Sequence, residues 1–406
     1  MKEVKIGCSS SYQKYGKRLD TAIIQVPRNS KISGLFTSNK FPAAPVKVAK
    51  RNLTNLDKKK KTALFINAGN ANAATGPEGL EDINKMFANY KDVNVLPFST
   101  GVIGERLDLQ RYGKSFFNAY KNLGKSSWKN FATSIMTTDK EEKIVKKSIK
   151  IKGETINFIG VAKGSAMIEP NMATMLSFVF TDLKISKLKL DKIHRLACES
   201  SFNSITIDGD QSTNDSSLLI ATGSSLISLS KANEKKILET LQDIFYSLAE
   251  KIVLDAEGAT KLISITVKGL KTENECKTVA KNIANSLLVK TAAFGEDPNW
   301  GRILMAVGNT NISFDEKKFN LKLGKLQVFR NNKLSSSYSE KLGLKEFKKR
   351  KIEIVIKLGD SSKTSKVLTS DLSKDYVSMN ADYRSCLLYT SPSPRDPHLS
   401  RMPSSA

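Results

Sequence analysis

Short apolar runs separated by turn residues dominate the first hundred residues of the chain. Four of these runs end in polar or Gly/Asn-rich loops and predict strands at residues 19–26, 33–38, 62–69 and 93–101. Two other segments carry apolar residues at helical spacing, at 79–90 and 109–124. Strands and helices therefore alternate from the start of the sequence.

The same alternation continues through the rest of the chain. TINFIGVAKGSAM and TMLSFVFTD predict two more strands, and the second is apolar enough to be buried on both faces. Helical spacing follows, and then further strand-like runs; the helices are expected at 188–202 and 231–251, and the strands at 262–268, 287–291 and 352–357. This pattern predicts an α/β fold of layered sheets with helices on the outside.

The charge balance raises a second class of function. The 406 residues carry a net charge of +25, which is typical of some nucleic-acid-binding proteins. However, the lysines are spread along the whole chain, and the densest runs, 58–61 and 345–351, lack interleaved aromatic residues. A lysine-rich solvated surface is the preferred interpretation, and nucleic-acid binding stays as the remote alternative.

Targeting and metal-binding patterns are scarce in the sequence. No run of about 18 apolar residues predicts a membrane span, and the first residues resemble neither a signal peptide nor a transit peptide, so we expect a cytoplasmic protein. Cys8, Cys198, Cys276 and Cys386 have no metal-like spacing. His194 and His398 are the only histidines, which argues against a histidine-based catalytic scheme or metal centre. We expect no metal and no cofactor, and a packing or surface role for His194.

The segment 163–182, KGSAMIEPNMATMLSFVFTD, offers a chemistry that needs no histidine. It places the small residue Ala173 directly before Thr174, which opens an apolar strand. A threonine hydroxyl can attack the preceding carbonyl, and hydrolysis then frees the threonine α-amine as a general base near neutral pH. On its own, a β-branched residue at the start of a buried strand is the better explanation.

Longer motifs favour the catalytic interpretation. The segment resembles the processing site of the ornithine acetyltransferase (glutamate N-acetyltransferase) family of arginine biosynthesis, in which cleavage falls between Ala and Thr. Matches in family order cover about all of residues 1–385, and they are LFTSNKFPAAPV, INAGNANAATG, LPFSTGVIGE, IMTTDK, TIDGDQSTND, DAEGATKLI, VKTAAFGEDPNWGRILMAVG and DLSKDYVSMNADYRS.

The resemblance implies a fold, a cleavage and a set of site residues. It implies a self-cleaving, N-terminal-threonine-nucleophile acetyltransferase fold, with an α chain of residues 1–173, a β chain of residues 174–385, and two copies of each in a heterotetramer. Thr174 is expected to be the nucleophile, and Thr100 and Gly101 are expected to form the oxyanion hole. The remaining expected substrate contacts, besides Thr174 itself, are Thr137 or Thr138, Lys163, Glu257, Asn380 and Ser385.

The family reaction is a ping-pong transfer. The threonine takes the acetyl group from N-acetylornithine and passes it to glutamate, and some members also accept acetyl-CoA as a donor. The sequence does not separate these two versions. A self-processing amidohydrolase or aminopeptidase of the same nucleophile type stays as the alternative from a second enzyme class.

Two other motifs resemble binding loops but receive structural interpretations. Asp208 and Asp210 in TIDGDQSTND lack a following carboxylate at calcium-loop spacing, so we expect a turn. INAGNANAATG (66–76) lacks the lysine of a phosphate-binding loop, so we expect a close-packed turn near the active site.

The C-terminus departs from the family pattern. The family usually ends in threonine at the position of Ser385, so the hydroxyl is kept and a methyl group is lost. The chain continues as CLLYTSPSPRDPHLSRMPSSA, residues 386–406, which is rich in Pro and Ser and resembles a translated sequencing-adapter tail. We expect this tail to be non-native and disordered.

Overall fold

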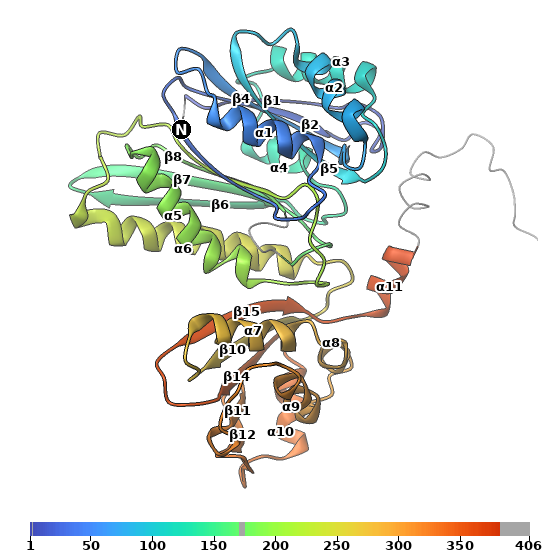
Figure 1. Cartoon of the computed structure of the whole chain (residues 1–406), viewed down its shortest axis with the longest axis vertical. Helices are drawn as coiled ribbons and strands as arrows, with labels where there is room; N and C mark the ends of the chain where they lie inside the picture. Colours follow the sequence, from blue (N-terminus) through green and yellow to red (C-terminus); the bar gives the residue numbers. More distant parts are fainter. Residues whose placement is uncertain (2, 170–174, 382–406) are drawn as a thin grey trace, which may run out of the picture.

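The computed structural model describes residues 1, 3–169 and 175–381, and these residues form three sheets (Figure 1). The first sheet has the order β1-β2-β4-β5, with β1 at Lys5–Ser9, β2 at Thr21–Val26, β4 at Lys61–Asn70 and β5 at Val93–Val102. Its strands pair antiparallel except for β4 and β5, which are parallel. The second sheet has the order β3-β9-β8-β7-β6, with β3 at Lys31–Phe36, β9 at Ser216–Ala221, β8 at Leu176–Thr181, β7 at Glu154–Lys163 and β6 at Lys143–Ile151.

These two sheets pack face to face. Their shared core contains Ile24 and Leu64 from the first sheet and Val161 and Phe178 from the second. The helices of this part of the chain are α1 (Ala44–Thr54), α2 (Gly76–Phe87), α3 (Leu109–Lys121), α4 (Trp128–Ser134), α5 (Lys187–Glu199) and α6 (Lys231–Leu254), with a 3-10 turn η1 at Phe202–Ser204. The expected α/β architecture of layered sheets is confirmed.

Helices cover the two outer faces of this sheet pair. Phe65 of β4 contacts Phe87 of α2 and Phe116 of α3, with ring centroids 4.6 Å and 5.5 Å apart. On the opposite side, α5 and α6 pack on the second sheet (Figure 1), and the apolar stripe of α6 explains why; it consists of Ile237, Leu241, Ile244, Leu248 and Ile252. Every residue of β8 is buried, since sheet and helix layers cover both of its faces.

A third sheet forms the C-terminal part of the molecule, drawn in orange and red at the bottom of Figure 1. Its order is β13-β12-β11-β14-β10-β15, with β10 at Leu262–Lys268, β11 at Asn320–Leu323, β12 at Leu326–Arg330, β13 at Lys333–Leu334, β14 at Lys351–Lys357 and β15 at Thr364–Ser370. The accompanying helices are α7 (Glu273–Ala284), α8 (Leu287–Phe294), α9 (Trp300–Gly308), α10 (Glu340–Phe347) and α11 (Lys374–Ala381), with the 3-10 turn η2 at Glu316–Lys318.

The strand expected at 287–291 is wrong, because this segment is the start of helix α8. The Ser286 side chain caps the helix by accepting a hydrogen bond from the Val289 backbone N–H at 3.3 Å. Val289, Ala292 and Ala293 then face the core at helical spacing. A short apolar run has the same appearance in a buried strand and in a short buried helix.

Segments on both sides of the expected cleavage position contribute to the second sheet. β7 precedes residues 170–174 and β8 follows them, and the two strands pair antiparallel with Lys163 opposite Leu176. β3 pairs with β9 across the same position in the chain. Residues 1–169 and 175–381 therefore share one hydrogen-bonded sheet.

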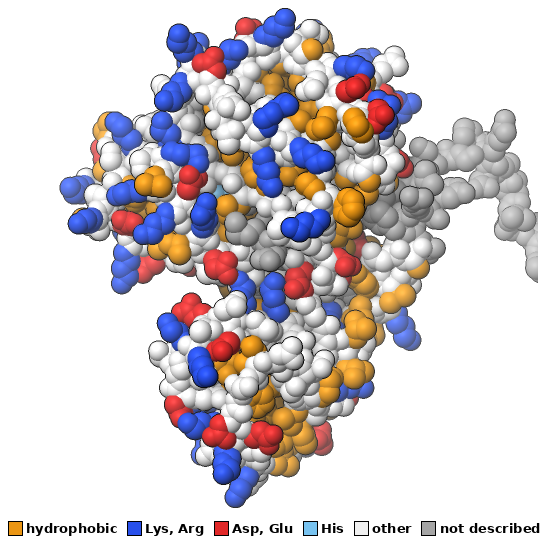
Figure 2. Space-filling model, viewed as in Figure 1, with side chains coloured by type: hydrophobic (Ala, Val, Ile, Leu, Met, Phe, Trp, Pro, Cys, Tyr) orange, Lys and Arg blue, Asp and Glu red, His pale blue; other side chains and the backbone are white. Residues whose placement is uncertain are grey.

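Charge is dispersed over the face shown in Figure 2, as the lysine distribution predicts. Figure 2 shows Lys and Arg side chains over most of the visible face, interspersed with Asp and Glu. No helix among the described residues is long and apolar enough to cross a membrane.

His194 has the packing role expected for it. It is buried on α5, with Nδ1 3.0 Å from Ser33 Oγ and Nε2 2.9 Å from Ser217 Oγ, and so links the helix to β3 and β9. Burial lowers the pKa of His194 from 6.5 to about 3.

This buried imidazole predicts a pH dependence of stability. The unfolded chain binds a proton at His194 below pH 6.5 that the folded chain does not bind, so this contribution is present above that pH and is lost as the pH falls toward about 3. We expect the urea midpoint to drop between about pH 7 and pH 4, and to drop less in His194→Gln, which cannot titrate. An equal drop in both proteins would contradict the assignment.

Candidate active site

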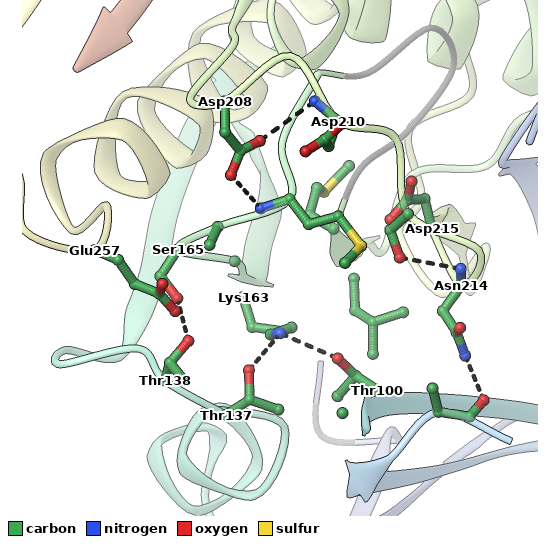
Figure 3. Close-up of a pocket in the computed structure, with 18 of the residues that line it drawn as sticks. Thr100, Thr137, Thr138, Lys163, Ser165, Asp208, Asp210, Asn214, Asp215 and Glu257 are labelled. Atoms are coloured by element: carbon green, nitrogen blue, oxygen red, sulfur yellow. Dashed lines mark hydrogen bonds between the residues drawn. The ribbon is translucent and has the colours of Figure 1, made fainter. Parts of the chain in front are cut away.

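A pocket of about 260 Å³ lies where β5, β7 and β8 meet the loops around Thr137, Asp208 and Glu257 (Figure 3). Seven of the residues that the sequence analysis selected line it: Thr100, Gly101, Thr137, Thr138, Lys163, Glu257 and Asn380. They come from segments that are far apart in the chain. The fold thus brings most of the expected site residues into one small cavity.

Thr100 and Gly101 lie at the end of β5. Gly101 has a φ of +133°, and a Cβ atom there would be 2.3 Å from the carbonyl carbon of Gly69 and 2.5 Å from the backbone nitrogen of Asn70. Only glycine fits this approach and this backbone conformation. Residues 66–70 belong to β4 and Gly76 begins α2, so the turn expected within 66–76 is confined to residues 71–75. Ala71 from this turn also lines the pocket.

Lys163 ends β7 and points between two threonines (Figure 3). Its Nζ donates to Thr137 Oγ1 at 2.8 Å and to Thr100 Oγ1 at 3.0 Å. Burial lowers the pKa of Lys163 and the nearby Lys143 lowers it further, whereas the Asp139 carboxylate opposes both effects. The pocket therefore holds Lys163 Nζ in hydrogen-bond contact with the expected oxyanion-hole residue Thr100.

A carboxylate lies on another side of the pocket. Glu257 is buried, and its backbone N–H donates to Ser165 O at 2.9 Å. Asn380 Nδ2 of α11 donates to Glu257 Oε2 at 2.9 Å, and Thr138 Oγ1 lies 2.7 Å from Ser165 Oγ. The cavity thus offers a cation, an anion and neutral hydroxyl and amide groups to a small molecule.

Asp208 forms the structural turn expected of it, although it also lines the pocket. Its carboxylate accepts hydrogen bonds from the backbone N–H groups of Met167 at 2.6 Å and Ile168 at 2.7 Å, and from Tyr376 Oη at 3.1 Å. It ties the chain after Lys163 to helix α11.

Several pocket residues were not singled out from the sequence. Asn214 Nδ2 donates to Ala71 O at 2.6 Å and to Ser99 O at 2.9 Å, which joins the loop before β9 to the end of β5. Its motif, TIDGDQSTND, was recognised, but nothing in the motif says which of its polar residues turns inward. Ser165, Asp215 and Tyr376 line the pocket as well.

Three expected site residues, Ala173, Thr174 and Ser385, lie outside the described residues, as do residues 386–406. The two residues that follow Thr174 are described. Met175 and Leu176 both line the pocket, and Leu176 begins β8. The two residues that follow the expected nucleophile in the sequence therefore belong to the pocket wall.

Comparison with known proteins shows the family of this chain. The ArgJ family model matches residues 5–385, which is nearly the whole chain. The chain belongs to the ArgJ family. A protein named arginine biosynthesis bifunctional protein ArgJ from Colwellia psychrerythraea is 38% identical over 405 residues, covering 94% of this chain and 96% of the relative. A protein of the same name from Psychrobacter arcticus is 39% identical over 393 residues, with the same coverage of both chains.

A solved structure carries the ArgJ name too. The crystal structure of arginine biosynthesis bifunctional protein ArgJ from Bacillus halodurans is 35% identical to this ArgJ-family chain. It covers 52% of this chain and 100% of its own, with a TM-score of 0.49.

Proposed function

We propose that the protein moves the acetyl group of N-acetylornithine to glutamate through an acetyl-Thr174 intermediate. Membership of the ArgJ family supports the acetyl transfer and its place in arginine biosynthesis. The observation that carries the proposal is the pocket at the start of β8, in which Thr100, Lys163 and Glu257 converge.

The charges of the pocket suit both substrates. N-acetylornithine and glutamate each carry an α-carboxylate, and each half-reaction also involves an amine. The Lys163 ammonium group can pair with a carboxylate, while Glu257 and Asn380 can bind an ammonium group. A volume of about 260 Å³ fits a small amino-acid derivative.

Each half-reaction balances with the residues of this chain. The Thr174 hydroxyl attacks the acetyl carbonyl, and its proton passes through the Thr174 α-amine to the leaving nitrogen of ornithine. The amine of glutamate then attacks the acetyl ester, and its proton returns to the threonine oxygen. Thr100 Oγ and the Gly101 backbone N–H would stabilise the oxyanion of both tetrahedral intermediates.

The second acetyl donor, the assembly and the location of the protein are proposed from its family. Acetyl-CoA is the second donor to test, because the named relatives are called bifunctional. The two cleavage products would associate as a heterotetramer of two α and two β chains, in the cytoplasm, with no cofactor. The shared second sheet supports a lasting association of the two fragments.

An assay with purified protein tests this function and separates it from hydrolysis. We expect N-acetylglutamate to form from N-acetylornithine and glutamate, and the release of acetate without glutamate to be much slower. Acetyl-CoA replaces N-acetylornithine in a parallel assay. Equal release of free acetate with and without glutamate would identify a hydrolase instead.

Glu257→Gln is expected to weaken substrate binding more than catalysis. The change removes the negative charge that Asn380 contacts and leaves an amide of the same shape. A charged hydrogen bond contributes about 1.5–3 kcal/mol, so the KM for N-acetylornithine should rise roughly 10–100-fold. The matched control is Glu199→Gln, which removes an exposed carboxylate that pairs with Lys277 outside the pocket. A fall in kcat with unchanged KM would instead assign Glu257 to the chemical step.

A further inference from the structure

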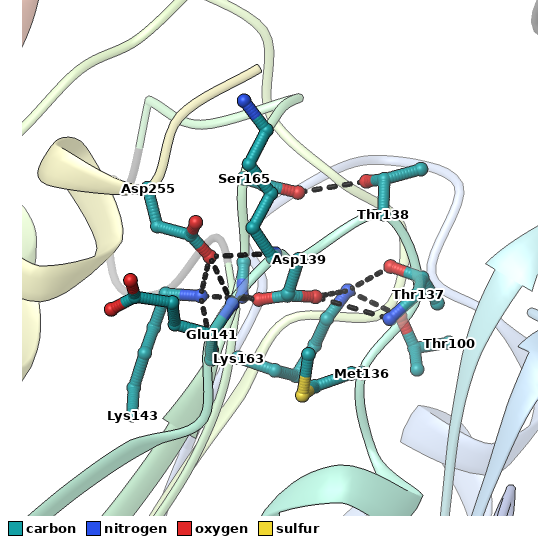
Figure 4. A network of polar contacts seen from close by, with 12 residues as sticks. Thr100, Met136, Thr137, Thr138, Asp139, Glu141, Lys143, Lys163, Ser165 and Asp255 are labelled. Atoms are coloured by element: carbon teal, nitrogen blue, oxygen red, sulfur yellow. Dashed lines mark hydrogen bonds and ion pairs between the residues drawn. The ribbon is translucent and has the colours of Figure 1, made fainter. Parts of the chain in front are cut away.

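A buried polar network lies directly behind the pocket, and its centre is Asp139 (Figure 4). The Asp139 side chain has no solvent exposure. Its Oδ1 accepts hydrogen bonds from Lys143 Nζ and from the Gly164 backbone N–H, both at 2.7 Å. Its Oδ2 accepts from the Thr137 backbone N–H at 3.1 Å and lies 4.0 Å from Lys163 Nζ.

The network extends to the end of helix α6. Lys143 Nζ donates to Asp255 Oδ2 at 2.5 Å, and the Lys140 backbone N–H donates to the same oxygen at 3.1 Å. Asp255 precedes Glu257 by two residues. One buried set of charges therefore holds three segments that line the pocket: the loop at 137–138, the end of β7 and the turn at Glu257.

We propose that Asp139 is a positioning residue for acetyl transfer, which holds Lys163 as an ammonium group aimed at Thr100 and thereby turns the Thr100 hydroxyl hydrogen toward the reacting carbonyl oxygen. This inference rests on the proposed function. It extends that function to Asp139, a residue that is not among those lining the pocket.

The direction of one hydrogen bond carries the argument. An ammonium group has three donors and no acceptor, so in the contact between Lys163 and Thr100 the threonine oxygen must accept. The one hydroxyl hydrogen of Thr100 then stays available for an oxyanion. A neutral Lys163 amine can accept, and Thr100 can then donate its hydrogen to the lysine instead of the substrate.

Asp139 opposes the loss of that charge. The described groups facing Lys163 are Asp139, Asp215 and Glu257, which favour the ammonium form, and Lys143, which disfavours it together with burial. Asp139 is the only one of these anions for which an ion pair with Lys163 within 4.0 Å is found among the described residues. Asp139 also accepts hydrogen bonds from the backbone N–H groups of Thr137 and Gly164. Thr137 accepts from Lys163 Nζ, and Gly164 follows Lys163 in the chain, so these contacts fix both ends of the lysine.

Asp139→Asn tests the inference through the pH profile of kcat. The amide keeps the shape of the side chain and removes its charge. The basic limb of this profile is the fall in kcat at high pH that deprotonation of Lys163 causes. Loss of a charge about 4 Å away should move this limb to lower pH by at least about one unit. At a pH above the shifted limb, kcat of the variant should be at least about tenfold below that of the wild-type protein. The matched control is Asp182→Asn, which removes a buried carboxylate that accepts from Asn157 at the opposite end of β7 and β8. It should change the melting temperature and leave the basic limb in place.

Lys143→Met provides a second variant with the opposite expectation. It removes a cation that faces Lys163 and leaves Asp139, so the basic limb should move to higher pH. This variant decides the question if Asp139→Asn does not fold. A purely structural role would not shift the limb in opposite directions for two neighbours.

Two results separate the failure of this inference from the failure of the proposed function. If the wild-type protein transfers acetyl groups but its basic limb does not move in Asp139→Asn or Lys143→Met, the positioning role of Asp139 is overturned. If the wild-type protein shows no glutamate-dependent transfer, the proposed function fails, and the positioning role falls with it.

Discussion

Thr174→Ala is expected to remain a single uncleaved chain without acetyl transfer activity. The side-chain oxygen is the nucleophile for both steps, and the α-amine that acts as the base is freed only by cleavage. The wild-type protein should give two bands on a denaturing gel, and N-terminal sequencing of the C-terminal fragment should give TMLSFVF. The two fragments should migrate together under native conditions, because β7 and β8 pair along their length.

Thr174→Ser is the matched control, since it keeps the hydroxyl and loses one methyl group. It should be cleaved and retain measurable transfer. An intact wild-type chain with full activity would contradict the assignment of Thr174, and so would activity in the alanine variant.

Thr100→Ala should lower kcat by roughly 10²–10³-fold and change KM much less. An oxyanion-hole donor acts mainly on the transition state, where one donor is worth about 2.7–4 kcal/mol. Steady-state kinetics with N-acetylornithine and glutamate measure the effect. Thr100→Ser keeps the hydroxyl that accepts from Lys163 and should retain most of the activity.

A rise in KM with unchanged kcat would reassign Thr100 to ground-state binding. Gly101→Ala provides an independent check of the same site. Its added Cβ would lie 2.3 Å from the Gly69 backbone, so the turn that carries the second expected donor must shift.

The layered fold could be predicted from the sequence because its main elements have strong local patterns. β8 is a mostly apolar run, and α6 repeats its apolar residues every three or four positions over 24 residues. The strand expected at 287–291 is wrong, because the eight mostly apolar residues of α8 lack a decisive period. The capping contact of Ser286 and the packing of Val289 decide its structure.

The site was only partly accessible from the sequence. Motif resemblance selected Thr100, Lys163 and Glu257, and the fold brings them into one pocket. The network that supports them was not visible, since Lys143 and Asp255 are separated by 112 residues and look like ordinary surface charges in the sequence. Which charges turn inward depends on tertiary packing, and a local pattern does not encode it.

The central claim is that Thr174 carries the acetyl group between the two substrates, and mass spectrometry of the cleaved protein tests it most directly. After incubation with N-acetylornithine alone, the fragment that begins at Thr174 should gain the mass of one acetyl group, located on its first residue. Addition of glutamate should remove that mass and yield N-acetylglutamate. An unmodified fragment during active turnover, or an acetyl group that glutamate does not remove, would contradict the account.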